Sequence, residues 1–152
     1  MEQDRFIASV LALGRTVDIA VFTVGAVDHD SLALNLGQLS ATEKDLLVER
    51  AVGDACSRFY RADGGIALPE VDARTVGISL SDLRRIPTRV LVAGGAHKAA
   101  AIDVALRTKL ATHLVIDDAT AERLLALDSP AAPASPGSPD SPDSSTPSPA
   151  TE

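Results

Sequence analysis

The sequence has little cysteine and histidine and no long apolar run, which argues against disulfide-linked, zinc-binding and membrane-spanning proteins. Cys56 is its only cysteine, so the chain cannot form an internal disulfide, which favours a reducing compartment. The three histidines, His29, His97 and His113, lie far apart and lack the spacing of zinc ligands. No apolar run approaches the roughly 20 residues of a membrane-spanning helix, and the N-terminus lacks the pattern of a signal peptide. We therefore expect a cytoplasmic protein with no metal ion, no other cofactor and no membrane contact.

Basic residues are also in the minority. The chain has 14 Lys and Arg against 21 Asp and Glu, a formal net charge of −7. Surfaces that bind nucleic acids have the opposite, basic balance. We therefore expect no direct contact between this chain and DNA.

The end of the chain lacks the residues that build a core. Residues 128–152 contain seven of the nine prolines, together with Ser, Ala and Asp, and no aromatic or large aliphatic residue. Such a composition buries too little apolar surface to offset the entropy of ordering. We expect one domain at residues 1–127 and a disordered Pro/Ser/Asp-rich tail at 128–152.

Apolar patterns predict alternating helices and strands in the body of the chain. Residues 5–13 have helical spacing that ends at Gly14. The run IAVFTVG, which ends at Gly25, is typical of a central strand buried on both faces. The remaining predictions before residue 89 are a short helical turn in 25–38, a helix with the capping box Ser40-x-x-Glu43, a strand at 52–60 that contains Cys56, a return strand at 74–78 and a short helix capped by Ser81.

Residues 89–118 are the most informative part of the chain. An apolar run at 90–93 ends at Gly94-Gly95, an alanine-rich helical segment follows, and a second apolar run at 113–116 ends at Asp117-Asp118. Two short runs that flank one helix predict a strand–helix–strand crossover with parallel strands. A last helix at 119–127, capped by one of the two aspartates, is expected to turn Leu124, Leu125 and Leu127 inward.

Gly94, Gly95 and Lys98 are a candidate anion site. Ligands of such folds bind beyond the carboxyl end of a strand, at the N-terminus of the next helix. Lys98 lies in that first turn, where the helix dipole by itself favours an acid. A bound phosphate explains a lysine there, and the alternative is a solvated surface side chain. His97 is adjacent but points about 100° away on a helix, so it is a weaker ligand candidate.

Four separated strings together resemble a known family. They are AVGDACSRFYRADGG, TVGISLSDLRRIP, VLVAGGAHKAAAIDVALR and HLVIDDATAERLLA, and DIAVFTVGAVD precedes them. In order and spacing, over about residues 5–127, they resemble the effector-binding domain of SorC/DeoR-type sugar-binding transcriptional regulators.

The resemblance implies a fold and a function. It implies an α/β parallel-sheet domain similar to the fold of sugar-phosphate isomerases and glucosamine-phosphate deaminases, which binds a sugar or sugar phosphate and so adjusts DNA binding by a helix-turn-helix. Met1 of this chain corresponds to a position in the middle of the family's effector domain. The resemblance thus implies a domain that is incomplete at its N-terminus, without its helix-turn-helix, and that associates with itself or with full-length relatives.

Two residues match the family's ligand contacts, and a third matches its glycine loop. The resemblance implies that the Asp54 carboxylate accepts hydrogen bonds from sugar hydroxyls, that Lys98 pairs with a phosphate, and that Gly25 lies in a glycine loop. The residues alone leave two alternatives for Asp54, which are a bond to local backbone amides and a pair with Arg58.

Three functions stay open at this stage. The favoured hypothesis is a non-catalytic sugar-binding module. A second is an isomerase- or deaminase-like enzyme, for which Asp54 is the only general-base candidate. A third is an interaction remnant without a ligand, since half an α/β domain exposes apolar faces and strand edges.

Overall fold

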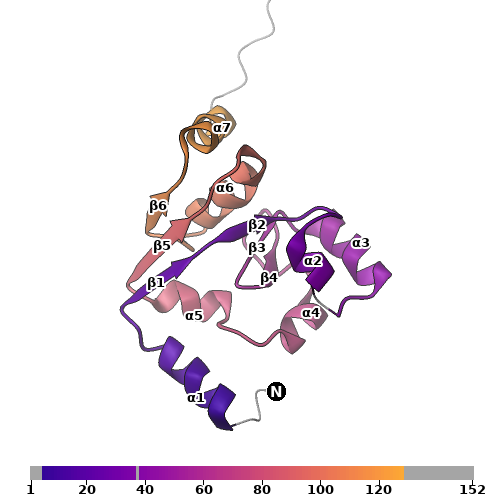
Figure 1. The fold of residues 1–152 in the computed structure, drawn as a ribbon, viewed down its shortest axis with the longest axis vertical. Helices are drawn as coiled ribbons and strands as arrows, with labels where there is room; N and C mark the ends of the chain where they lie inside the picture. Colours follow the sequence, from indigo (N-terminus) through magenta and orange to yellow (C-terminus); the bar gives the residue numbers. More distant parts are fainter. Residues whose placement is uncertain (1–4, 37, 129–152) are drawn as a thin grey trace, which may run out of the picture.

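The structure, a computed structural model, describes residues 5–36 and 38–128 (Figure 1). The predicted tail lies outside the described residues from 129 onward, and the domain boundary at 127 stays a prediction. The helices are α1 (Arg5–Gly14), α2 (Leu32–Leu36), α3 (Ala41–Arg50), α4 (Pro69–Arg74), α5 (Leu80–Arg85), the 3-10 helix η1 (Ala96–Lys98), α6 (Ala99–Arg107) and α7 (Asp118–Asp128). The strands are β1 (Ile19–Phe22), β2 (Val24–Ala26), β3 (Gly53–Ala55), β4 (Arg58–Tyr60), β5 (Thr88–Val92) and β6 (His113–Val115).

Three strands form a parallel sheet in the order β1-β5-β6. The crossover from β5 through α6 to β6 was predicted from the sequence, and the parallel pairing of Leu91 with Leu114 confirms it. On one face of this sheet, Phe22 and Leu91 join a core with Leu83 of α5 and Ile102 of α6. The predicted α/β class with a parallel sheet is therefore confirmed.

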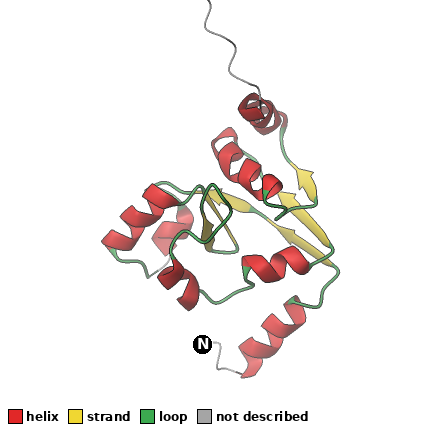
Figure 2. Ribbon diagram, turned by 180° about the vertical axis from the view of Figure 1, so that it is seen from behind, coloured by secondary structure: helices red, strands yellow, loops and turns green. Residues whose placement is uncertain are grey.

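No element among the described residues covers the other face of the parallel sheet. Ile19 and Val21 of β1 are 61% and 70% exposed. The prediction that this strand is buried on both faces is therefore wrong within the described chain, because no element packs on the side to which these two residues point. Leu83 of α5 and Ile102 of α6 belong to the same core, so both helices pack on the covered face of this sheet, whose strands are yellow in Figure 2.

The strands β2, β3 and β4 form a second sheet, which is antiparallel. The segment at 52–60 is a hairpin of two strands, and Cys56 lies in its exposed turn rather than in a strand. Both turn residues, Cys56 and Ser57, have positive φ angles of 54° and 62°, as two-residue type I′ hairpin loops require. Gly25 was expected at the end of a strand, but it lies inside β2, opposite Asp54 of β3.

The return strand predicted at 74–78 is absent. Arg74 ends α4, and residues 75–79 form an irregular connection to α5. The guanidinium of Arg58 donates to the carbonyls of Thr75 and Gly77. These acceptors are therefore occupied by a side chain and are not free to pair with a neighbouring strand.

The ends of the helices follow local sequence signals closely. Ser40 and Glu43 form the predicted capping box of α3. The cap of α5 is Ser79, two residues before the predicted Ser81, because its hydroxyl accepts the amide of Asp82. No helix in the described ranges is both long and apolar enough to cross a membrane.

Helix α7 differs from the prediction in its buried face. Asp117 caps the helix by accepting the backbone amide of Thr120. Leu124 is half-buried, but Leu125 and Leu127 are exposed. The expectation that all three leucines turn inward is therefore wrong, since the residues at 125 and 127 lie on the outer side of the helix.

Candidate functional site

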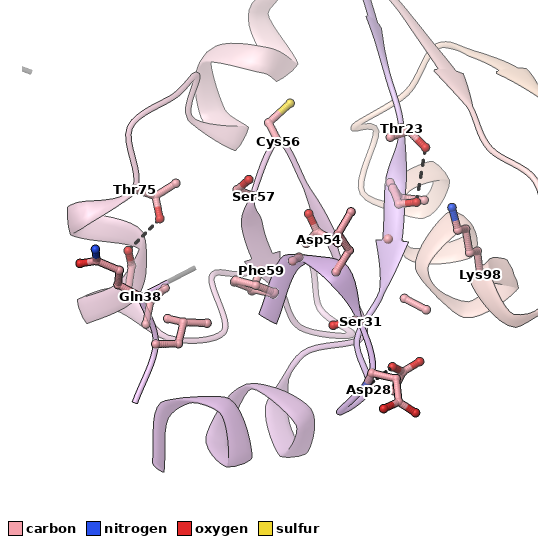
Figure 3. Close-up of a pocket in the computed structure, with 18 of the residues that line it drawn as sticks. Thr23, Asp28, Ser31, Gln38, Asp54, Cys56, Ser57, Phe59, Thr75 and Lys98 are labelled. Atoms are coloured by element: carbon pink, nitrogen blue, oxygen red, sulfur yellow. Dashed lines mark hydrogen bonds between the residues drawn. The ribbon is translucent and has the colours of Figure 1, made fainter. Parts of the chain in front are cut away.

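An open pocket of about 1280 Å³ lies beside the antiparallel sheet (Figure 3). Its walls come from β2 and β3, the loop before α2, the end of α4 and the 3-10 helix η1. Leu34, Leu47, Phe59 and Val71 form a second core behind it, and Phe59 and Val71 also line the pocket. The polar groups that line it include Thr23, Asp28, Ser31, Asp54, Ser57 and Lys98.

Asp54 lies directly over Gly25. A Cβ atom placed on Gly25 meets the Asp54 Oδ1 atom at 2.2 Å, a distance that two non-bonded atoms do not adopt. The missing side chain of Gly25 is therefore what allows the carboxylate to lie across β2. Gly25, which was expected in a glycine loop, thus makes room for the acid beside it.

This contact predicts the effect of one added methyl group. We expect Gly25→Ala to lower the free energy of unfolding by about 1–3 kcal/mol, as overpacking does, and to displace the Asp54 carboxylate. The matched control is Gly14→Ala, because a Cβ on Gly14 meets nothing within 4 Å. Urea unfolding of both variants tests this, and equal stabilities for the two contradict it.

The half-buried Asp54 carboxylate has a raised pKa. Burial is the main cause, and it is opposed by the Ser57 backbone amide and by the positive charge of Lys98. Arg58, the alternative ion-pair partner, donates to Asp72 instead. Asp54 is therefore a carboxylate in a pocket with no salt bridge to satisfy it among the described residues.

Lys98 lies at the junction of η1 and α6 and faces the same pocket. Figure 3 shows the Asp54 and Lys98 side chains on either side of strand β2. Lys98 is half-buried and makes no salt bridge with any residue in the ranges 5–36 and 38–128. An ammonium group in this position is available to an anionic ligand.

Gly94 and Gly95 do not line this pocket. The amide of Gly95 donates to Asp117 Oδ2 at 3.0 Å and to Thr120 Oγ1 at 2.9 Å. Hydrogen bonds from the amide and the hydroxyl of Thr120, together with the one from the Gly95 amide, lower the pKa of Asp117 to about 2. The glycine pair thus joins β5 to the start of α7, and its amide is already occupied by the protein.

His97 lines the pocket but is exposed. A Cβ on Gly95, whose φ is +107°, meets the His97 ring at 2.6 Å. The ring therefore lies against the backbone of Gly95, where only glycine leaves room for it. Of the six candidate residues, the structure brings Gly25, Asp54, His97 and Lys98 to one pocket and leaves Gly94 and Gly95 outside it.

Arg58 supports the pocket wall and was missed by sequence reasoning. Its side chain is 6% exposed, and it donates at 2.8–3.0 Å to four backbone carbonyls and one carboxylate, which are those of Asp72, Thr75, Gly77 and Ile78 and the Oδ1 atom of Asp72. Thr75 and Val76 line the pocket. Arg58 therefore holds in place a loop that has no regular structure of its own.

Sequence reasoning also missed the acceptors on the far wall. Asp28 and Ser31 come from the loop that follows β2. The Ser31 Oγ atom is buried and has no hydrogen-bond partner within the described part of the chain. A loop after the carboxyl end of a strand is the one signal that could have indicated these residues. No group of three or more His, Cys, Asp or Glu residues suited to a metal ion occurs among the described residues.

Comparison with known proteins gives a consistent set of relatives. A family model described as "Putative sugar-binding domain" matches residues 1–126. The "Deoxyribonucleoside regulator" of Bacillus subtilis is 43% identical over 125 residues, which are 82% of this chain and 40% of that protein.

Solved structures agree with this relationship. The DeoR family transcriptional regulator from Listeria monocytogenes superposes with a TM-score of 0.75 at 35% identity, over 81% of this chain and 50% of that one. The full-length sorbitol operon regulator SorC from Klebsiella pneumoniae gives 0.71 at 27% identity, over 82% and 41%. The chain thus spans about two fifths to one half of the length of these relatives.

Proposed function

The chain belongs to the family of sugar-binding domains of DeoR- and SorC-type transcriptional regulators, and we propose that its pocket binds a phosphorylated sugar. The observation that carries this proposal is the presence, in one pocket, of a half-buried carboxylate and an ammonium group that has no salt bridge to any described residue. Asp54 and Lys98 supply these groups.

The two charges suit the two parts of such a ligand. The Asp54 carboxylate accepts hydrogen bonds from sugar hydroxyls, and the Lys98 ammonium pairs with the phosphate oxygens. The Ser31 hydroxyl, which has no hydrogen-bond partner in the described part of the chain, offers the ligand a further contact. His97, at the edge of the pocket, is a secondary contact, and Gly25 acts through Asp54.

We propose a binding role rather than a catalytic one. The relatives that the chain matches are named as transcriptional regulators. In this proposal the chain is the sensing part of a cytoplasmic regulator, and DNA contacts belong to residues outside it. The test is to incubate the purified protein with ribose and hexose phosphates and to follow the mixture by NMR. Accumulation of a product contradicts a binding role without catalysis.

The proposal is tested by calorimetric titration of the full chain with pentose and hexose phosphates and with the parent sugars. We expect saturable binding, with at least one phosphorylated sugar bound roughly tenfold or more tightly than its parent. If the folded protein binds none of these compounds below millimolar concentration, the result favours the third hypothesis, in which the chain is an interaction remnant that binds no ligand.

A substitution at Asp54 is expected to separate stability from binding. Burial raises the pKa of this carboxyl in the folded state. The folded protein is therefore destabilised as the pH rises above the pKa of an unfolded aspartate, because the buried group must then ionise. We expect Asp54→Asn to raise the free energy of unfolding at pH 7 by about 0.5–2 kcal/mol. The same change is expected to weaken binding of phosphorylated and neutral sugars alike.

The measurements for Asp54 are urea unfolding at pH 4 and pH 7 with calorimetry. The gain in stability should shrink at pH 4, where the wild-type carboxyl is protonated to a larger extent. A variant that is less stable than the wild type at pH 7, or that binds sugars equally well, contradicts this assignment.

A further inference from the structure

Four segments of the chain meet at Gly53. A Cβ atom placed on this glycine meets the Ala101 Cβ atom at 2.5 Å, the Tyr60 hydroxyl at 2.8 Å and the Gly25 carbonyl oxygen at 2.9 Å. Strands β2, β3 and β4 and helix α6 therefore approach one another here as closely as a missing side chain allows. We call the three residues Gly53, Tyr60 and Ala101 the junction.

A buried hydrogen bond joins the hairpin to helix α6 at the junction. Tyr60 is 1% exposed, and its hydroxyl donates to the Ala101 carbonyl at 3.0 Å. Burial, and after it the negative charge of Asp54, raises the pKa of the Tyr60 phenol above its usual range. The hydroxyl therefore stays protonated at neutral pH, and strand β4 stays bonded to the first turn of α6.

The junction lies behind the pocket, next to both of its charged groups. None of its three residues lines the pocket. Asp54 follows Gly53 along β3, and side chains alternate along a strand, so the carboxylate points to the pocket while the junction contacts α6. Lys98 precedes Ala101 by three residues, which is about one turn of helix. The contact between β3 and α6 therefore holds the two charged groups relative to each other.

We propose that Gly53 and Tyr60 are positioning residues for the pocket. They set the distance between the Asp54 carboxylate and the Lys98 ammonium, and this distance selects sugar phosphates of matching length. Groups that contact a ligand keep a productive geometry, to within about 0.5 Å, only when the residues behind them are packed and bonded. A neutral sugar needs the carboxylate alone, whereas a sugar phosphate must reach both groups. This inference rests on the proposed function and adds to it the selection by length.

Gly53→Ala tests the proposal by adding one methyl group behind the pocket. The new Cβ atom has no space, so α6 must move away from β3 and take Lys98 with it. We expect the affinity for a sugar phosphate to fall about tenfold or more and the affinity for the parent sugar to change less than about threefold. The preference between pentose and hexose phosphates should move toward the longer hexose phosphates. Calorimetric titration measures these affinities.

The dependence on Lys98 separates positioning from a general loss of structure. In a Lys98→Ala background no ammonium is left to position, so Gly53→Ala should change the affinity for the sugar phosphate less than about twofold. Tyr60→Phe removes only the hydroxyl and should show the same dependence with a smaller loss, roughly three- to tenfold. This second variant keeps the test decisive if Gly53→Ala does not fold. The control is Thr108→Val, which removes a hydroxyl bonded to the Val104 carbonyl at the other end of α6 and should change neither affinity.

A measurement without ligand tests the distance between the charges. The positive charge of Lys98 lowers the pKa of Asp54 against the effect of burial, so a variant that moves the ammonium away should raise that pKa. We expect Gly53→Ala and Tyr60→Phe to raise it when Lys98 is present and to leave it unchanged in the Lys98→Ala background. A pH titration of the Asp54 carboxyl followed by ¹³C NMR measures it.

The two measurements distinguish failure of this inference from failure of the proposed function. If the wild-type protein binds no sugar phosphate but the pKa of Asp54 responds as expected, the proposed function fails and the positioning of the two charges stands. The inference is overturned if neither variant changes that pKa, if both leave the affinity for the sugar phosphate unchanged, or if their affinity losses persist in the Lys98→Ala background.

Discussion

Arg58→Ala is expected to lower the free energy of unfolding by about 3–5 kcal/mol. The guanidinium is buried and donates to four carbonyls and to the Asp72 carboxylate. Its removal takes this donor from the half-buried carbonyls of Thr75, Gly77 and Ile78 and from the Asp72 carboxylate, while the Asp72 carbonyl keeps the Thr75 amide. Because whole domains are stable by only about 5–15 kcal/mol, the variant should unfold at much lower urea concentration. Urea unfolding followed by circular dichroism measures the difference.

Two further variants separate this network from a general effect of charge. Arg58→Lys keeps the positive charge but loses the planar fork of donors, so we expect a stability between those of Arg58→Ala and the wild type. Arg61→Ala removes an exposed arginine that is paired with Asp63 and should change stability little. If Arg58→Ala and Arg61→Ala are equally stable, the guanidinium does not hold the loop at 75–78.

Lys98→Ala is expected to weaken binding of a sugar phosphate roughly 10- to 150-fold. A hydrogen bond between charged groups contributes about 1.5–3 kcal/mol, and each 1.4 kcal/mol corresponds to a factor of ten in Kd. The affinity for the parent sugar should change less than about threefold, because that ligand has no anionic group for the lysine to bind. Calorimetric titration of each variant with both ligands measures the two ratios.

The controls for Lys98 address charge and position. Lys109→Ala removes a lysine that is exposed and does not line the pocket, and it should leave both affinities unchanged. Lys98→Arg keeps a cation and should retain part of the preference for the phosphate. Equal losses for the phosphorylated and the neutral sugar in Lys98→Ala contradict the role of Lys98 as the phosphate partner.

The parts of the fold that depend on neighbouring residues were predictable from the sequence. The crossover at 89–118 was predicted because two apolar runs flank a single helix, and the capping box of Ser40 and Glu43 because its signal spans three residues. The hairpin at 52–60 was interpreted as one strand, since its turn consists of Cys56 and Ser57 rather than glycine or asparagine. A two-residue turn of cysteine and serine has no residue type that indicates a turn in the sequence.

The site was only partly predictable, for a different reason. Lys98 follows a glycine pair at a strand-to-helix junction, which is a recognisable pattern, but the same pattern also indicated Gly94 and Gly95, which do not line the pocket. Asp117 takes the Gly95 amide from 22 positions farther along the chain. The network of Arg58 likewise joins residues 14–20 positions apart. Contacts between residues so far apart in the chain form only in the folded protein, and no repeating pattern in the sequence indicates them.

The central claim is that one pocket holds the hydroxyls of a sugar through Asp54 and its phosphate through Lys98. Chemical-shift mapping of the ¹⁵N-labelled chain during titration with a sugar phosphate tests it most directly. The account predicts saturable shifts at Gly25, Asp54, Ser57 and Lys98, and none around Gly64, which does not line the pocket. Shifts that cluster elsewhere, or no shifts at millimolar ligand with a folded protein, contradict it.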